Sequence, residues 1–230
     1  MKQYILLVSC LSAVFFVGCA PSVEFMNPTP TEPPLGYSGP VAIAMPVQVG
    51  DTWVFQSEGG KRYTVQVRAV ETTEHGPEIT MDAPPWVAAE CVGCLFTYDV
   101  AGTVIRVTNA SGIALIKDQW LVKWRVVDLP LYAGKISEFK AGWLISHIVH
   151  RKLHLDIMKN QIRVVGYEKV TVPAGQFDAF KVEWSWTDET HPWSGKGYYW
   201  YVGELQTIIK SELGWIENFV LVEYRQARNP

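Results

Sequence analysis

The chain has 230 residues, of which 48% are hydrophobic and 19% charged, and its formal net charge is −3. This length fits one good-sized domain or two small ones, and the apolar fraction is enough for a proper core. The weak negative charge and the lack of a Lys/Arg cluster exclude a strongly basic nucleic-acid binder, so no nucleic-acid partner is expected. Ten Trp, ten Tyr and nine Phe suit either an aromatic-rich β core or a cleft that stacks a ligand.

Residues 1–18 have the pattern of an export signal. Lys2 supplies a positive start, and the apolar run from Ile5 to Val17 follows it. This run is shorter than the roughly 20 residues that a membrane-spanning helix needs. The segment is therefore expected to direct export.

The signal ends in Phe16-Val17-Gly18-Cys19, which resembles the bacterial lipobox, although Phe16 replaces the usual Leu. The resemblance implies cleavage before Cys19 and attachment of acyl chains such as palmitate, which would anchor the protein in a membrane. Ala20 after the cysteine implies the inner leaflet of an outer membrane, if the cell has one, and otherwise the outer face of the cytoplasmic membrane. The alternative is an ordinary signal peptide or an uncleaved anchor, with Cys19 incidental.

Residues 19–44 are expected to form the lipidated N-terminus and a Pro-rich tether. The stretch from Pro21 to Pro40 holds six prolines and few apolar residues in its middle. Such a segment stays extended, at about 3.1 Å per residue, and would hold the domain away from the membrane. A docking motif for a partner is the other interpretation of the same prolines.

Residues 45–230 are expected to form one antiparallel β domain. In its first half, Val49 to Phe55 reads as a turn and a strand, and a hairpin turn at 58–61 leads to the alternating strand 62–68. The Gly76-Pro77 step predicts a loop over 71–85. Further strands are predicted at 95–100, 103–108, 113–116 and 120–127, with a less regular link over 129–139.

The second half alternates apolar and polar residues over longer stretches. Pro173-Ala174-Gly175 predicts a tight turn, because proline cannot donate to a ladder and glycine tolerates positive φ. Strands are predicted at 167–172, 180–186, 198–202, 207–212 and 218–225. The fold class is therefore all-β: a single strongly curved antiparallel sheet or half-open barrel.

Cys91 and Cys94 lie three residues apart, and in an exported protein they are disulfide candidates. A thioredoxin-like redox pair remains an alternative, although no βαβ context surrounds it. A metal half-site would need a second pair of ligands, and Leu95 stands where a c-type haem site needs His.

His147, His150 and His154 form a histidine cluster, which would share one face if the segment 142–158 were helical. The flanking residues instead alternate apolar and polar, which favours a strand. His150 and His154 would then lie about 13 Å apart, too far to share one metal, so no metal site is predicted.

Motifs for catalysis are lacking: there is no Gly-rich phosphate loop, no G-x-S-x-G and no H-E-x-x-H. Glu183, Asp188 and Glu189 lie near tryptophans, an arrangement common to glycan-active enzymes and to solvated strand edges. The second interpretation is favoured, so we expect neither an enzyme nor a cofactor.

Several segments resemble a group of bacterial envelope lipoproteins of unassigned function. They are Gly50-Asp51-Thr52-Trp53, the Val-Pro-Ala-Gly-x-Phe-Asp-Ala motif within Val172 to Val182, Tyr199-Trp200-Tyr201 and Ile209-Lys210-Ser211-Glu212. The group is similar in fold to the half-barrel lipoprotein carriers, which implies a curved sheet around an apolar cavity. The candidates for lining that cavity are Trp53, Phe180, Trp184 and Trp200.

Three functions follow as hypotheses. The favoured one is a lipid-tethered, non-catalytic module that binds a lipid or another hydrophobic ligand in the cell envelope. The alternative is a structural or assembly lipoprotein that presents a sheet surface to an envelope protein complex. The least favoured is an enzyme acting on glycans through Asp188 or Glu189.

Overall fold

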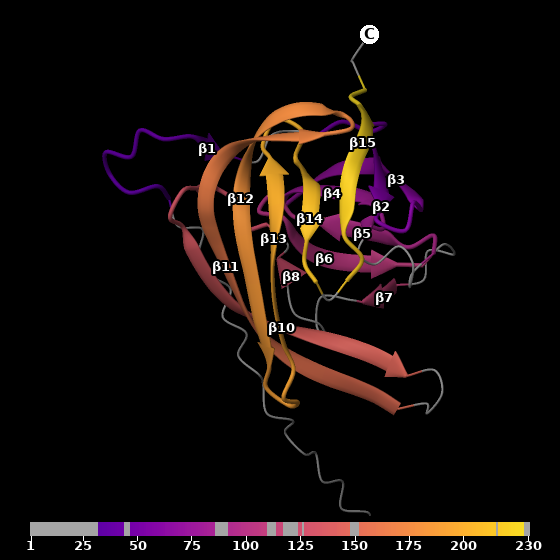
Figure 1. Cartoon of the computed structure of the whole chain (residues 1–230). Helices are drawn as coiled ribbons and strands as arrows, with labels where there is room; N and C mark the ends of the chain where they lie inside the picture. Colours follow the sequence, from indigo (N-terminus) through magenta and orange to yellow (C-terminus); the bar gives the residue numbers. More distant parts are fainter. Residues whose placement is uncertain are drawn as a thin grey trace, which may run out of the picture.

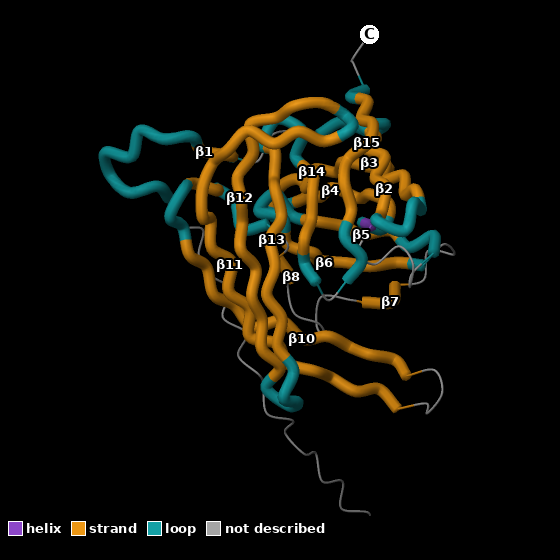
Figure 2. Tube along the Cα trace, viewed as in Figure 1, coloured by secondary structure: helices purple, strands orange, loops and turns teal. Residues whose placement is uncertain are grey.

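A computed structural model describes residues 32–43, 47–85, 92–109, 114–116, 124–125, 127–147, 152–214 and 216–227. The described residues are strands and their connections, apart from one helical residue at Pro85 (Figure 2). No helix among them has the length and apolar character needed to cross a bilayer. The predicted signal peptide, Cys19 and most of the Pro-rich tether lie outside the described residues.

The strands run antiparallel throughout, as predicted (Figure 1). Thirteen of them form one sheet in the order β10-β11-β12-β13-β14-β15-β2-β3-β4-β5-β6-β7, with β8 paired to β6; β1 and β9 form a separate pair. Because β10 and β7 end this order, the sheet is open. The strands are β1 Val41–Ala42, β2 Thr52–Ser57, β3 Arg62–Thr73, β4 Gly76–Asp82, β5 Leu95–Tyr98, β6 Thr103–Thr108, β7 Ala114–Ile116, β8 Trp124–Arg125, β9 Leu131–Tyr132, β10 Ile136–His147, β11 Lys152–Val172, β12 Gly175–Asp188, β13 Ser194–Val202, β14 Thr207–Glu212 and β15 Phe219–Arg225.

The predicted loop over residues 71–85 is wrong. β3 continues to Thr73, and β4 begins at Gly76, so the two strands form a hairpin. Gly76 has a φ of 105°, which suits the end of the turn. Pro77 lies second in β4 and pairs with Thr72, a position near a strand start that proline tolerates.

The histidine segment is strand and not helix, as predicted, but it contributes to two strands, β10 and β11, where one was expected. β10 and β11 pair antiparallel from Ile136 opposite Arg163 to His147 opposite Lys152, so the segment is a hairpin. Alternation could not reveal this, because the same parity pattern occurs on both arms of a hairpin.

The sheet curls strongly at the tip of the β11–β12 hairpin, which bends over toward β15 in Figure 1. The backbone N–H of Ala174 in this tip donates to the carbonyl oxygen of Leu221 in β15, at 3.2 Å. Phe177 packs edge-on against Tyr224, with ring centroids 5.9 Å apart. The Val-Pro-Ala-Gly-x-Phe motif thus makes a turn and holds its tip on a strand that is three strands away in the sheet.

The two ends of the domain meet where β15 pairs with β2. Phe55 and Phe219 pack edge-on across this pair, at 5.4 Å. The carboxylate of Asp51 accepts hydrogen bonds from the backbone N–H groups of Gln48 (2.8 Å) and Ala227 (2.6 Å). Asp51 of the early Gly-Asp-x-Trp segment therefore ties the start of the sheet to its last strand.

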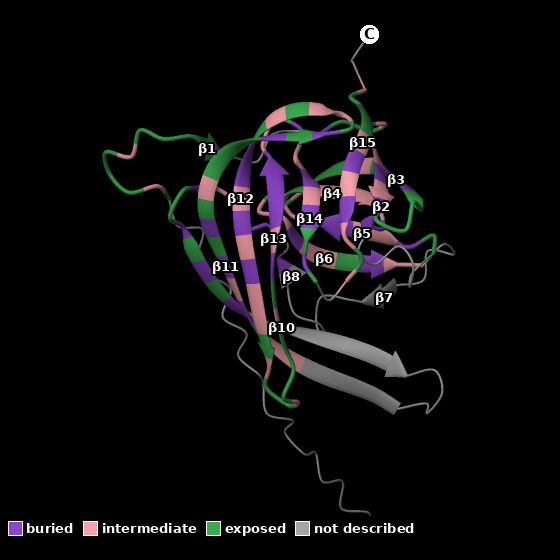
Figure 3. Cartoon of the chain, viewed as in Figure 1, coloured by how far each residue is buried: buried purple, intermediate pink, exposed green. Residues whose placement is uncertain are grey.

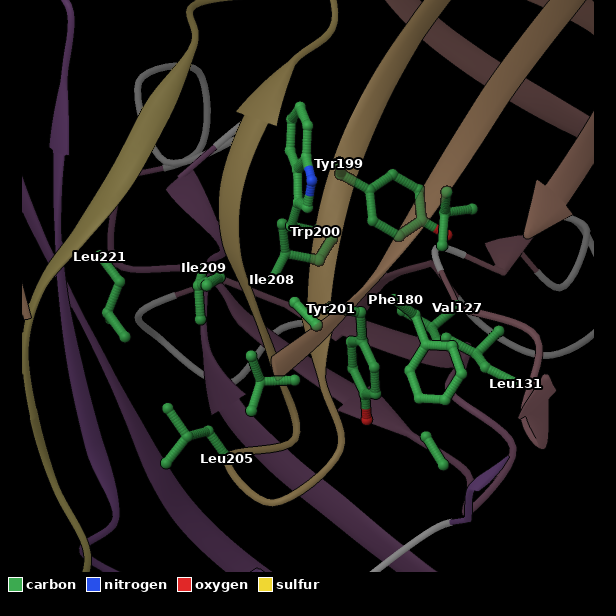
Figure 4. Close-up of a cluster of buried hydrophobic side chains, with 14 of the residues drawn as sticks. Val127, Leu131, Phe180, Tyr199, Trp200, Tyr201, Leu205, Ile208, Ile209 and Leu221 are labelled. Atoms are coloured by element: carbon green, nitrogen blue, oxygen red, sulfur yellow. The ribbon is translucent and has the colours of Figure 1, made fainter. Parts of the chain in front are cut away.

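Buried and exposed residues alternate along several strands (Figure 3), and the buried hydrophobic side chains form one core cluster. Figure 4 shows part of this core, where Phe180 lies close to Tyr201, Val127 and Leu131. The segment 127–135, between β8 and β10, contributes Val127, Leu129 and the fully buried Leu131 to this core.

The packed region begins before residue 45. β1 pairs with β9, placing Val41 opposite Tyr132. Tyr37 contacts the Tyr132 ring at 5.5 Å, and its hydroxyl accepts the backbone N–H of Ala133. The C-terminal part of the predicted tether therefore lies against the domain.

Candidate functional site

A cavity of about 380 Å³ lies between two parts of the concave face. One wall comes from β2, β3 and β4, and the other from the β13–β14 turn region and from Val127 and Leu129. Strand register explains why these side chains converge. Trp53 pairs with Val65 across β2 and β3, and Tyr201 pairs with Ile208 across β13 and β14. Paired residues of antiparallel strands share one face, so both rows line the cavity.

The cavity opens toward the end of the β3–β4 hairpin. Val70 and Val100, which both line it, are 39% and 41% exposed. Trp53, Phe55 and Val65 line it as well, and each is at most 4% exposed. This gradient of burial gives the cavity an apolar mouth and an apolar floor.

Two tyrosines bring polar groups into this wall. Tyr98 pairs with Ile79, which pairs with Val70, so the three side chains form one row across β3, β4 and β5. Tyr201 comes from the opposite wall. Burial raises the pKa of Tyr98 and the pKa of Tyr201 well above the usual value for a phenol, so both hydroxyls stay neutral. Neither hydroxyl makes a hydrogen bond within the described part of the chain.

The cavity wall carries little charge. Among its described residues none is Lys, Arg or His, and Asp99 is the one carboxylate. One oxygen of Asp99 already accepts the backbone N–H groups of Ala101 (2.9 Å) and Thr103 (2.8 Å). The wall therefore offers apolar surface and neutral donors.

A buried charge network lies next to the cavity, on the segment that supplies Val127 and Leu129. Asp128 accepts from Nη1 of Arg125 at 2.6 Å and pairs with Nζ of Lys135 at 2.8 Å. Ser137 donates to the same carboxylate, and Nε of Arg125 donates to the Thr103 hydroxyl at 3.0 Å. Burial lowers the pKa of Lys135, and the contact with Asp128 opposes that effect. This network fixes the inner segment against both halves of the sheet.

Of the four predicted cavity residues, the structure places Trp53 in the wall. Phe180 and Trp184 are buried on the same concave face but are absent from the lining. Phe180 packs on Tyr167, with ring centroids 4.7 Å apart, and Nε1 of Trp184 donates to Asn160 at 3.0 Å. These two aromatic residues fill the core beside the cavity.

Trp200 does not face the cavity, contrary to expectation. It lies between Tyr199 and Tyr201, which point inward, and pairs with Lys181 and Lys210 on the outer face. The two ammonium groups lie 5.1 and 4.5 Å from its ring centroid, which is cation–π distance. Its Nε1 donates to Glu168 at 2.7 Å. Trp200 is only 5% exposed because these long side chains cover it.

The carboxylates considered for glycan chemistry are engaged in local structure. Burial raises the pKa of Asp188, but hydrogen bonds from Thr190 and His191 outweigh it and lower this pKa to about 2. Ion pairs with Lys140 and Lys159 lower the pKa of Glu189. A catalytic acid needs a raised pKa, so this arrangement suits the ends of a turn better than acid catalysis.

A second hollow of about 510 Å³ lies on β10, β11 and β12, near Lys140 and Lys159. Phe139, Asn160 and Trp186 line it as one row across the three strands. Its wall mixes ammonium, amide and hydroxyl groups with these two rings, so it is more polar than the cavity between the sheet halves.

The cysteine and histidine predictions fall partly outside the described residues. Cys94 is buried and disulfide-bonded, while Cys91 lies outside, so their pairing stays a prediction. His150 lies outside too, and of His147 and His154 only the backbone is described. No group of three His, Cys, Asp or Glu that could hold a metal occurs among the side chains that the structure describes.

No family model matches the chain, and no curated protein matches it. The solved structures that are similar to it include the following three. An inferred lipoprotein of Parabacteroides distasonis has 17% identity and a TM-score of 0.37, with 80% of this chain and 99% of that chain covered. The hypothetical lipoprotein YmcC of Escherichia coli has 9% identity and a TM-score of 0.45, with coverage of 78% and 89%. An inferred exported protein of Bacteroides fragilis with a YmcC-like fold has 14% identity and a TM-score of 0.37, with coverage of 80% and 100%. At these identities and scores the likenesses assign neither a family nor a function.

Proposed function

We propose that this protein is a membrane-tethered, non-catalytic module that binds a hydrophobic ligand in the cell envelope. The observation that carries the proposal is the cavity of about 380 Å³ between the two parts of the concave face. Its volume lies in the range of about 300–1,000 Å³ typical of ligand sites, and its wall is mainly apolar. The exposed valines at its mouth suit the entry of an apolar molecule.

The tether rests on the sequence Phe16-Val17-Gly18-Cys19. Acyl chains on Cys19 would hold the protein at the membrane that supplies the ligand, in the inner leaflet of an outer membrane where the cell has one. Metabolic labelling with a palmitate analogue and mass measurement of the mature N-terminus test this. Labelling that disappears in Cys19→Ala supports the anchor, and a mature N-terminus without fatty acid contradicts it.

The ligand proposal is tested by native mass spectrometry of the protein extracted from its own membranes. We expect a co-purifying lipid on the wild-type protein and its loss from Ile79→Trp, which places a large ring in the cavity wall. Val70→Trp at the exposed mouth is a second blocking variant that disturbs the core less. The matched control is Ile136→Trp on β10, where the side chain is 48% exposed. Equal lipid occupancy in all four proteins would contradict binding in this cavity.

The assembly function keeps one specific observation in its favour. β10 ends the sheet order, so its outer edge over Ile136–His147 has no partner strand among the described residues. A strand edge of twelve residues is a template for a partner strand. A photo-crosslinking residue at exposed Glu138 should then capture an envelope protein that the same residue at Lys169 on β11 does not. Equal capture at both positions would count against the edge.

A further inference from the structure

The polar groups of the cavity wall indicate which hydrophobic ligand it takes. Tyr98 and Tyr201 are each at least nine-tenths buried, and their hydroxyls lack hydrogen-bond partners in the described structure. Neither hydroxyl oxygen is among the fully buried polar atoms that lack a partner in the described structure, so both are open to the cavity. A ligand that covers them without offering an acceptor costs free energy, so these two groups favour a ligand that brings an acceptor with it. A pure hydrocarbon would leave both hydroxyls unsatisfied.

The same wall selects against charge on the ligand. No Lys, Arg or His lies among its described residues, so a buried carboxylate or phosphate would find no counter-ion. Asp99, the carboxylate in the wall, would also repel an anion. Since burial raises the pKa of both phenols, they donate as neutral groups and do not become anions that could hold a cation.

We propose, as a refinement that rests on the proposed function, that the cavity binds an uncharged acyl ester, with the chain against the apolar floor and the ester carbonyl at Tyr98 and Tyr201. Membrane glycerolipids and the diacylglyceryl group of lipoproteins both carry this chemistry. The free fatty acid, which is ionised at neutral pH, is the form that the wall disfavours.

The test is a displacement titration with the uncharged fluorophore Nile red on the full-length Cys19→Ala protein after bound lipid has been removed. The competitors are methyl laurate, laurate, dodecane and dodecylammonium, which share a similar chain and differ at its end. We expect methyl laurate to bind at least about tenfold more tightly than laurate, because no cation compensates the carboxylate. Methyl laurate should also bind more tightly than dodecane, by roughly threefold to tenfold for each hydrogen bond gained.

The variants Tyr98→Phe and Tyr201→Phe, alone and together, remove the donors and keep the shape of the wall. They should weaken the binding of methyl laurate by the same factor, roughly threefold to tenfold for each hydroxyl removed. The affinity for dodecane should stay unchanged. The matched control is Tyr167→Phe, which lies on β11 outside the cavity lining. If the double variant fails to fold, either single variant and the wild-type ratio of methyl laurate to laurate decide the question.

The outcomes separate the two proposals. If no competitor, dodecane included, displaces Nile red, the binding function fails and this inference fails with it. If dodecane binds as well as methyl laurate in the wild type, or if laurate or dodecylammonium binds more tightly, the binding function stands and the ester assignment is overturned. Two further ligands then identify the source of the ester. Tighter binding of dilauroylphosphatidylcholine points to membrane lipid, and tighter binding of a diacylglyceryl-cysteine peptide points to lipoprotein.

Discussion

At the scale of single residues, Asp188 shows how a carboxylate near tryptophans can stabilise a turn. Its Oδ1 accepts the backbone N–H and the hydroxyl of Thr190, at 2.7 and 2.6 Å, and the N–H of His191 at 3.1 Å. These bonds hold the turn between β12 and β13 in one conformation. They need the ionised form, which is why the pKa falls to about 2 despite burial.

This lowered pKa predicts a loss of stability in acid. A carboxyl group with a folded pKa of about 2, against an ordinary value of 3.8, stabilises the fold at pH values above 3.8. That contribution disappears as pH falls from 3.8 toward 2, because the unfolded chain takes up the proton first. In the Asp188→Asn variant, the melting temperature should therefore depend less on pH in this window than it does in the wild type. Thermal unfolding followed by circular dichroism measures this.

The control for Asp188 is Asp178→Asn, because Asp178 is half-exposed and pairs with Lys169 at 3.1 Å. This variant should keep the acid sensitivity of the wild type. If Asp188→Asn keeps the wild-type slope of melting temperature against pH, other carboxylates cause the acid sensitivity.

Asp128 is the residue on which the buried charge network depends. Its carboxylate lies between Arg125 and Lys135, and all three side chains are at most 8% exposed. Asp128→Asn would leave two buried cations without their anion, so we expect a loss of about 3–5 kcal/mol in the free energy of unfolding. Denaturant titration at neutral pH measures it. In the exposed pair, Asp178→Asn should cost at most about 1 kcal/mol, and an equal cost at both sites would contradict the network's role.

At the scale of elements, the β11–β12 turn is where backbone geometry constrains the residue type. Gly175 has a φ of 143°, which side chains rarely adopt. Gly166 in β11 has no positive φ, and a Cβ added there would meet no atom within 4 Å. Gly175→Ala should therefore lower the free energy of unfolding by about 1–3 kcal/mol. Gly166→Ala should leave it unchanged or raise it by up to about 1 kcal/mol. Thermal and denaturant unfolding of both variants checks this, and an equal effect would contradict the backbone argument.

Some strands could be predicted to the residue, as β14 shows over Thr207–Glu212, and the alternating strand β3 could be predicted at its start, Arg62. The β3–β4 hairpin was missed because Gly76-Pro77 has the local chemistry of a loop, while pairing with β3 makes it a strand. The sequence also does not show on which face of the sheet Trp200 lies, because the strand Tyr198 to Val202 is apolar at every position. Only its pairing with Lys181 and Lys210 assigns its side.

At the scale of the whole molecule, the cavity depends on contacts that no local pattern carries. Tyr98 and Tyr201 lie about a hundred residues apart in sequence, and they line one cavity because β15 joins β14 to β2. Sequence alternation supports a curved sheet, and so an interior, but it cannot give the strand order that brings these two walls together. Trp53, the second residue of β2, can be proposed from its place in the Gly-Asp-x-Trp segment, whereas no local pattern distinguishes the two tyrosines.

The same join predicts that the two parts of the sheet unfold together. Leu221 of β15 is fully buried beside the pair of β15 with β2, so Leu221→Ala should cost about 2–5 kcal/mol. If the sheet is one cooperative unit, hydrogen exchange should quicken by the same factor in β3 and in β12, which lie on opposite sides of the join. The control is Val165→Ala, at a 43% exposed position on β11. It should change neither the free energy of unfolding nor the hydrogen-exchange rates. Faster exchange confined to one side would mean that β15 joins two units that unfold separately, and the cavity would then lie between parts that can open without loss of the fold.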